Sequence, residues 1–245
     1  WWMLARSFGL YVNAASFEAI ARSIPFTILV RHRVQLFQLE ALLMGQAGLL
    51  NADRPDPYYQ HLKNEYLFLR LKYALHPVPY TVQFLRMRPP AFPTIRLAQL
   101  AMMLHKNGSM LSYLLQAQEV KEIHLLLDIA AGDYWNDHFI FGEPGIYAPK
   151  HLGLQMANTI VINGVVPLVF AYGQFHQSEQ YKSRALRWLE TLSSEKNSTV
   201  QGFSKLGISS SNAAESQALV ELKTQYCDHR HCLDCAVGNF ILKRT

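Results

Sequence analysis

The stretch PYYQHLKNEYLFLRLKY, residues 57–73, indicates the fold class most directly. Its large apolar side chains recur at intervals of three and four residues, as one face of an α-helix requires. That face consists of Tyr59, Leu62, Tyr66, Leu69 and Tyr73. Lys63 and Arg70 fall outside it and are available to solvent. The stretch therefore predicts a long amphipathic helix that packs on a core.

Helical periodicity continues on both sides of this stretch, and no segment alternates cleanly enough to predict a strand. A helix is expected to start at Pro93 and to end before Asn107 and Gly108, because proline suits a first turn and Asn-Gly suits a helix end. Further helices are expected after Ser178 and Asn212, which are capping residues. We predict a mainly α protein, an irregular multi-helix globular bundle of roughly nine or ten helices with a short C-terminal cysteine-rich knot.

The breaks between these helices divide the chain into three parts. Residues 1–195 are expected to form a helical core domain. The polar, Ser-rich stretch 196–212 predicts a mobile loop or hinge. Residues 213–245 are expected to form a C-terminal helix with a cysteine module, packed on the core. Asn212 with Glu215 predicts a capping box at the start of that helix.

The longest apolar run, LGLQMANTIVINGVVPLVFAYG at 152–173, has the length of a membrane span. Three side-chain amides are spread along it, and Gly164 and Pro167 interrupt it. Amides are costly in lipid, so we predict a buried core helix kinked at Pro167 and no membrane association. Half of the 245 residues are hydrophobic and 17% are charged, a composition that favours a globular protein with a sizeable core. We expect the protein to be cytoplasmic.

Charge and cysteine content add expectations about the partner and the compartment. The formal net charge of +5 is a mild basic excess, which is compatible with an anionic partner. Three cysteines are too few for a disulfide framework and indicate a reducing compartment. The chain opens with Trp1, and Met3 lies inside an apolar helical run. We therefore expect the parent protein to have a further N-terminal region, which would be a partner of this chain.

All three cysteines fall within QYCDHRHCLDCAVGN, residues 225–239. They are spaced C-x4-C-x2-C: Cys227, Cys232 and Cys235. A C-x2-C turn brings two sulfurs to one side, as in zinc sites, and the whole spacing also occurs in plant-type iron–sulfur proteins. His229 is the better fourth ligand, because His231 directly precedes Cys232. The pattern predicts zinc or an iron–sulfur cluster. Three reduced thiols in a structural knot, or a Cys227–Cys232 disulfide, are the alternatives.

An arginine-containing stretch, FLRMRPPAFPTIRLAQLAMMLHKNG at 84–108, predicts an anion site. Prolines force an extended segment in which Arg86 and Arg88 project to the same side. Arg96 falls in the first turn of the next helix, where a cation opposes the helix dipole unless a carboxylate or a bound anion compensates it. The three arginines are expected to converge on an anion or on a nucleic-acid phosphate. Ion pairs with a neighbouring helix are the alternative.

The stretch AAGDYWNDHFIFG, residues 130–142, concentrates titratable and aromatic side chains. On a helix, Asp133 and Asp137 would lie one turn apart on one face. Together with His138 they are candidates for acid–base catalysis or metal binding. The simpler interpretation is that Asp133 caps a short helix after Gly132 and the aromatic residues anchor it.

Six stretches in order resemble one family: FEAIARSIP, EALLMGQAGLL, LRMRPPAFPTIRLAQLA, DYWNDHFIFG, NTIVINGVVPLVFAYG and SQALVELKTQYCDHRHCLDCAVGN. They are similar to the C-terminal part of an uncharacterised bacterial family, domain of unknown function 2851. The resemblance covers nearly the whole chain. It implies a further N-terminal region that is β-containing and carries its own acidic and histidine residues. It supplies no activity and no site residues.

Three functions remain open from the sequence. The first is an accessory helical module, with a C-terminal metal or iron–sulfur site, of a bacterial protein acting on nucleic acid. The second is an enzyme module whose anion pocket binds a small phosphorylated or carboxylate substrate. The third is a non-catalytic scaffold. The motifs of P-loop NTPases, dinucleotide-binding domains, zinc proteases and α/β-hydrolases are missing from the sequence.

Overall fold

The computed structural model describes residues 1–79, 82–85 and 87–242. Helices account for 65% of residues, and the described ranges contain no β-strand. The predicted fold class, mainly α and globular, is confirmed. The chain forms two compact units, Trp1–Leu168 and Val169–Thr245. The boundaries predicted from the sequence differ from this division and remain a prediction.

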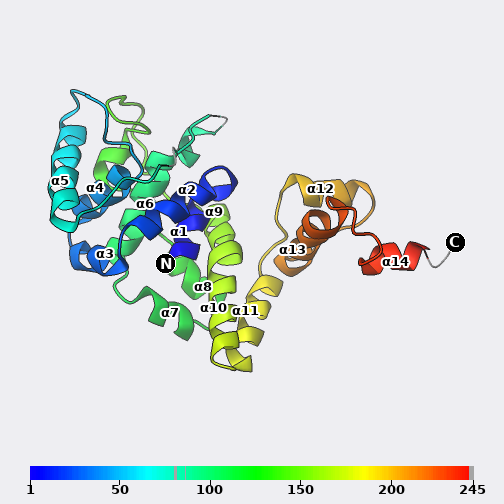
Figure 1. The fold of residues 1–245 in the computed structure, drawn as a ribbon. Coiled ribbons are helices and arrows are strands. Elements are labelled where there is room, and N and C mark those ends of the chain that lie inside the picture. Colours follow the sequence, from blue (N-terminus) through cyan, green and yellow to red (C-terminus); the bar gives the residue numbers. More distant parts are fainter. Residues whose placement is uncertain (80–81, 86, 243–245) are drawn as a thin grey trace. The chain divides into compact units, whose positions relative to one another are not determined.

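Figure 1 shows the helices in chain order. In the first unit they are α1 (Trp2–Phe8), α2 (Leu10–Ser23), α3 (Phe26–His32), α4 (Leu36–Gln46), α5 (Pro57–Tyr73), α6 (Pro93–Lys106), α7 (Met110–Gln116), α8 (Val120–Leu126) and α9 (Leu154–Ile160). Short 3-10 turns lie at Pro89–Ala91 and Asp133–Asn136. Helix α10 (Val166–Phe175) contains the boundary between the units. The second unit continues with α11 (Glu179–Thr191), α12 (Ser198–Lys205), α13 (Ala213–Glu221) and α14 (Ala236–Leu242). Several helices are only seven residues long, which is why they outnumber the nine or ten expected.

Helix α4 forms the centre of the first unit's core. Every residue from Leu39 to Gln46 is buried, and α4 packs between α5 and α6 (Figure 1). The close approach to α5 depends on Gly45, because a Cβ atom there would lie 2.2 Å from the ring of Tyr66. Since real side chains do not approach so closely, the α4–α5 contact requires glycine at this position.

Helix α5 has the bounds of the stretch from which the fold was predicted. Of its predicted inner face, Tyr59, Leu62, Tyr66 and Leu69 are buried and Tyr73 is half-buried. Asp56 caps the helix, accepting a hydrogen bond from the backbone N–H of Tyr59 at 2.8 Å. Pro57 occupies the first position, where its missing N–H costs no hydrogen bond. The amphipathic helix is therefore confirmed in position and orientation.

Helix α6 starts at Pro93 and ends at Lys106, as predicted. Nearly all of it is buried, so it is a second central helix of the first unit. Near its start, the hydroxyl of Thr94 donates to the backbone oxygen of Phe139 at 2.5 Å. This bond ties the beginning of α6 to the aromatic stretch 130–142.

The apolar run 152–173 forms a helix over Leu154–Phe175. It contains a π-helical turn, Val161–Val165, directly before Pro167, where the prediction placed a proline kink. A wider turn accommodates a proline, which has no N–H for the normal ladder. By length and composition this is the one helix among the described residues that could cross a membrane. Half of its apolar window is buried within the protein, as in a core helix.

In the second unit, α11 packs against α13. Trp188 of α11 is 1% exposed, and Ala213 at the start of α13 is fully buried. The backbone N–H of Ala213 donates to Leu192 at 2.9 Å. The stretch 196–212, predicted as a loop, contains α12 over Ser198–Lys205. The Asn197 side chain caps this helix by accepting a hydrogen bond from the backbone N–H of Val200. The prediction, which relied on composition, missed this capping residue.

The C-terminal cysteine-rich knot is not seen as such. A π-helical segment, Leu222–Cys227, follows α13. The chain then makes turns over residues 228–230 and 232–234 and continues as α14.

Candidate functional site

The C-terminal ends of α3, α5 and α6 meet in one place. His32 is the last residue of α3, and Tyr73 is the last residue of α5. The Tyr73 hydroxyl donates a hydrogen bond to Nε2 of His32 at 2.8 Å. His105 in the last turn of α6 donates from Nδ1 to the backbone oxygen of Arg33 at 2.7 Å. The Arg33 guanidinium also packs over Gly108, where a Cβ atom would collide with it. Side chains from three helix ends therefore share one surface.

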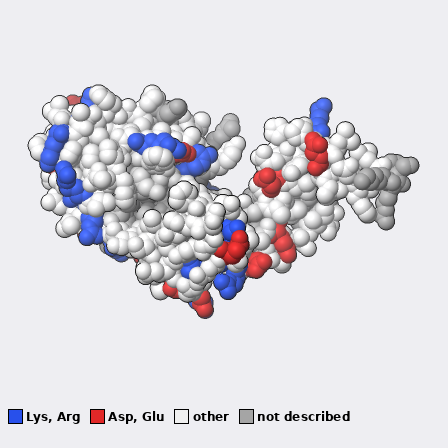
Figure 2. All heavy atoms as spheres, turned by 60° about the horizontal axis from the view of Figure 1, so that its bottom comes forward, with Lys and Arg blue, Asp and Glu red and all other residues white. Residues whose placement is uncertain are grey.

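Each of these helix ends carries cations. We call the following five exposed side chains the basic surface: Arg31, Arg33, Arg70, Lys72 and Lys106. No member forms an ion pair with a described residue. Figure 2 shows Lys and Arg side chains following one another along the edge formed by α5 and α3. Glu65, the only acidic residue of α5, instead accepts a hydrogen bond from Gln38.

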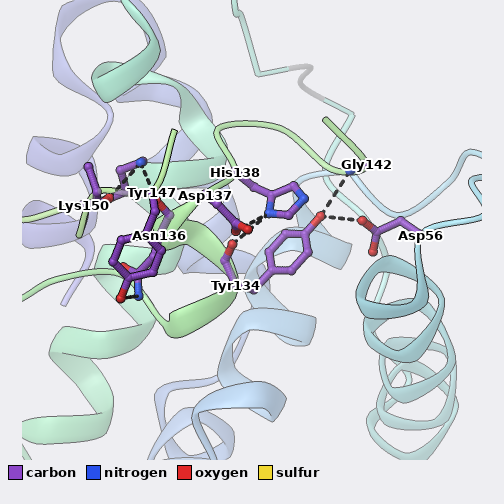
Figure 3. Close-up of polar contacts among 9 residues, drawn as sticks. Asp56, Tyr134, Asn136, Asp137, His138, Gly142, Tyr147 and Lys150 are labelled. Carbon is purple, nitrogen blue, oxygen red and sulfur yellow. Dashed lines mark hydrogen bonds and ion pairs between the residues drawn. The ribbon is translucent and has the colours of Figure 1, made fainter. Parts of the chain in front are cut away.

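A second cluster lies at the opposite end of α5, around Tyr134 (Figure 3). The Tyr134 hydroxyl donates to the Asp56 carboxylate at 2.6 Å and accepts from the backbone N–H of Gly142 at 3.1 Å. Partial burial disfavours the charged form of Asp56, but the hydrogen bonds from Tyr134 and the backbone outweigh this effect and lower its pKa. Asp56 is therefore a fixed negative charge at the start of α5.

His138 stacks on Tyr134, with ring centroids 4.1 Å apart and planes inclined by 11°. Its Nδ1 donates to the Asp137 carboxylate at 2.7 Å and to the backbone oxygen of Tyr134 at 3.0 Å. Among the described residues its Nε2 has no hydrogen-bond partner. His138 and Asp56 line a cleft of about 390 Å³ together with Arg54 and Glu143. A histidine held by a carboxylate, with its second nitrogen open, can accept a proton from a bound group.

Beneath this cluster, Glu40 of α4 is completely buried. Its carboxylate accepts hydrogen bonds from the Tyr58 hydroxyl at 2.5 Å and from the Trp135 indole at 3.2 Å. Burial raises the pKa of Glu40 to about 7, and these hydrogen bonds act in the opposite direction. Glu40 joins α4, α5 and the 3-10 turn that carries Tyr134.

The comparison with known proteins identifies a family. A family model described as "Protein of unknown function (DUF2851)" matches residues 1–198. The chain belongs to this family. No curated protein and no solved structure matches it. The family recognised from the sequence is confirmed, and the match contains five of the six stretches; the sixth, residues 216–239, lies outside it. The DUF2851 match covers the basic surface and the Tyr134 cluster.

The predicted anion site at 84–96 stays a prediction in this DUF2851 chain. Arg86 lies outside the described residues, and Arg88 is exposed. Arg96 is 9% exposed, and burial lowers its pKa to about 10. Its Nη1 donates to Gln99 at 2.8 Å, and Gln99 donates to the backbone of Lys150 at 2.9 Å. The Arg96 side chain thus reaches one turn along α6.

Lys150 is a second buried cation. Its Nζ donates to the backbone oxygens of Asn136 at 2.9 Å and Ala148 at 2.8 Å (Figure 3). It also lies 4.3 Å from the ring of Phe139. These contacts satisfy the ammonium group and fix the segment that follows the Tyr134 cluster.

The acid–base candidates are only partly brought together. The 3-10 turn ends at Asn136, so Asp133 and Asp137 do not share a helical face as the spacing predicted. Asp133 makes no capping hydrogen bond, and Gly132 occupies the cap position. Asp137 and His138 are in contact, and His138 faces the cleft. Their proposed catalytic role remains a prediction.

The cysteines remain a candidate metal site on spacing alone. All three are free thiols, with Cys227 and Cys232 exposed and Cys235 buried. The rings of His229 and His231 lie 5.7 Å apart. Within the described ranges, no three His, Cys, Asp or Glu side chains are grouped so that they could hold a metal ion.

Sequence reasoning singled out Asp137 and His138 but missed Asp56, Glu40 and the basic surface. Asp56 could have been found from Asp-Pro before a helical run, because aspartate is a capping residue and proline suits the first turn. The sequence shows cations near the ends of three predicted helices, but it does not indicate that these ends meet to form the basic surface. Glu40 lies in a strongly apolar helix, where its partners Tyr58 and Trp135 come from other elements.

Proposed function

We propose that the first unit binds the phosphate backbone of a nucleic acid through the basic surface. The main support is that three helix ends meet at this surface. Their five exposed cations have no ion-pair partner among the described residues. Unpaired Lys and Arg side chains on one surface neutralise phosphates and release condensed counterions. In this proposal the chain is the accessory helical module of a cytoplasmic, bacterial protein that acts on nucleic acid.

The same cations also interact favourably with the negative ends of the helix dipoles. That interaction contributes about 0.3–1 kcal/mol per cation to stability and needs no ligand. Binding phosphate and stabilising a helix dipole can be distinguished by replacing a cation with a neutral residue. Loss of a dipole interaction lowers the melting temperature, whereas loss of a phosphate contact lowers affinity for nucleic acid.

The test compares two double variants of equal charge. Arg70→Gln with Lys72→Gln removes two members of the basic surface. Arg6→Gln with Arg22→Gln removes two exposed arginines that already pair with Glu18, at 2.9 and 2.8 Å. Binding of a labelled 20-nucleotide DNA is measured by fluorescence anisotropy in 0.1 M salt. Each phosphate contact contributes about fivefold under these conditions, so the first variant should bind roughly 25-fold more weakly.

The control variant should bind within about twofold of the wild type, because it removes no member of the basic surface. Equal affinities for all three proteins would overturn the proposal. So would a first variant that is destabilised but binds as tightly as the wild type, since the cations would then serve only the helix dipoles.

A second candidate function is favoured by the cleft at Asp56. His138 is held by Asp137 and lines this cleft, an arrangement suited to general-base catalysis on a small ligand. Metabolite binding can be screened by thermal shift with the wild type and with His138→Asn. A ligand that stabilises only the wild type supports this function, and an equal shift in both proteins argues against it.

A further inference from the structure

The outer face of α5 presents apolar side chains to solvent. Leu67, Phe68 and Leu71 are 43%, 57% and 83% exposed, although the opposite face of the helix is buried in the core. Leu71 follows Leu67 by four positions and Phe68 by three, so it neighbours both on the helix surface, and the three side chains form one stripe about 100° wide. The stripe is about one turn long. It is therefore a local feature of the second half of α5.

Cations border this stripe on both sides. At 100° per residue, Arg70 lies beyond Leu67 on one side and Lys72 lies beyond Phe68 on the other. The Lys72 ammonium is 5.6 Å from the centre of the Phe68 ring. Both cations belong to the basic surface, so an apolar stripe lies between positively charged groups on one exposed area.

This combination fits a ligand that offers negative charges and flat apolar faces together. A single-stranded nucleic acid does so, because its unpaired bases can stack on an aromatic ring while neighbouring phosphates contact Lys and Arg. A duplex stacks its bases internally and presents mainly phosphates and groove edges. A helix that lies on an anionic membrane instead needs an apolar face along its length, and α5 buries its long apolar face in the core.

We propose that the basic surface prefers single-stranded over double-stranded nucleic acid, with an unpaired base stacked on Phe68. This inference rests on the proposed function, because it names the substrate class of the same surface. The phosphate contacts of Arg70 and Lys72 then hold the strand across the stripe, and Phe68 supplies a contact that a duplex does not use.

The experiment measures the affinity of labelled oligothymidylate, 20 nucleotides long, and of a 20-base-pair duplex, each at two salt concentrations. The variant is Phe68→Ala, and the matched control is Leu125→Ala, which removes a 72% exposed apolar side chain from α8 of the same unit. Phe68→Ala should weaken oligothymidylate binding about tenfold and leave the duplex affinity and both salt dependences unchanged. Leu125→Ala should change neither affinity. Because Phe68 is more than half exposed, circular dichroism should show an unchanged fold for the variant.

The outcomes separate this inference from the function on which it rests. Salt-dependent binding of both oligonucleotides with equal affinity, unaffected by Phe68→Ala, would overturn the preference and leave the proposed function standing. Absence of binding to either oligonucleotide would overturn the proposed function as well. Binding to vesicles that contain phosphatidylglycerol tests whether the surface contacts a membrane instead. If they bind the protein in a Phe68-dependent manner and oligothymidylate does not, the surface is a membrane contact and both proposals are wrong.

Discussion

Replacing Glu40 by Gln should remove a measurable part of the pH dependence of folding. Glu40 is completely buried, and its pKa is raised from 4.5 to about 7, first of all by burial. The folded state therefore holds this proton more tightly than the unfolded state. The stability that Glu40 contributes is fully present below pH 4.5 and is lost as the pH rises through 7.

The magnitude follows from the two pKa values. Each difference of one pKa unit corresponds to about 1.4 kcal/mol, so the whole effect is about 3 kcal/mol. Between pH 6 and pH 8 the protonated fraction of folded Glu40 falls from about nine-tenths to about one-tenth, and the free energy of unfolding should fall by about 1.3 kcal/mol from this group alone. Glutamine has the same shape and stays neutral, so Glu40→Gln should lack this decrease.

The assay is urea unfolding at pH 6, 7 and 8 and constant ionic strength. Ten histidines also titrate in this range, so the informative quantity is the difference between wild type and variant at each pH. Glu143→Gln is the matched control, because it removes an exposed carboxylate of the same unit. If Glu40→Gln shows the same decrease between pH 6 and pH 8 as the wild type, Glu40 is not a buried acid that titrates near neutrality.

Two further predictions concern packing and the cysteines. Gly45→Ala should lower the free energy of unfolding by about 1–3 kcal/mol, because the new Cβ would overlap the Tyr66 ring. Gly202→Ala is the control, because a Cβ there would meet open space and should not destabilise the protein. Urea unfolding of both variants checks this difference. The cysteine spacing predicts one zinc ion or iron–sulfur cluster per chain in protein purified without oxygen. Metal analysis and a visible spectrum check this, and less than about a tenth of an equivalent of metal would contradict it.

The sequence predicts helices well where the signal is local, such as an apolar stripe at helical spacing or a proline or asparagine at a helix end. The apolar stripe of residues 57–73 predicts the buried face of α5, and Pro93 and Asn107 predict the ends of α6. The capping box at α13 is close to the observed contacts. Asn212 accepts from the backbone N–H of Glu215 at 2.9 Å, but the Glu215 carboxylate reaches the N–H of Ser211 instead.

The candidate sites are harder to predict, because they depend on which elements meet. Arg70 was recognised as exposed, but its association with Arg31 and Arg33 requires the contact between His32 and Tyr73 across two helices. The prediction from the spacing of Asp133 and Asp137 assumed an α-helix, but a short 3-10 turn begins at Asp133 and ends before Asp137. Composition misled the prediction at residues 196–212, where serines were taken to indicate a loop although Asn197 caps a helix.

The salt dependence of oligonucleotide binding measures how many phosphates the basic surface contacts. The five cations of the basic surface are unpaired among the described residues, and each phosphate that they neutralise on a single strand releases about 0.7 counterion. If all five make contacts, a plot of the logarithm of the association constant against the logarithm of salt concentration should have a slope of about −3.5. Affinity should then fall roughly 100-fold between 50 and 200 mM salt. The Arg70→Gln, Lys72→Gln variant should show a slope of about −2, and the Arg6→Gln, Arg22→Gln control should keep the wild-type slope. Undetectable binding at 50 mM salt, or a slope that the first variant leaves unchanged, would contradict the account.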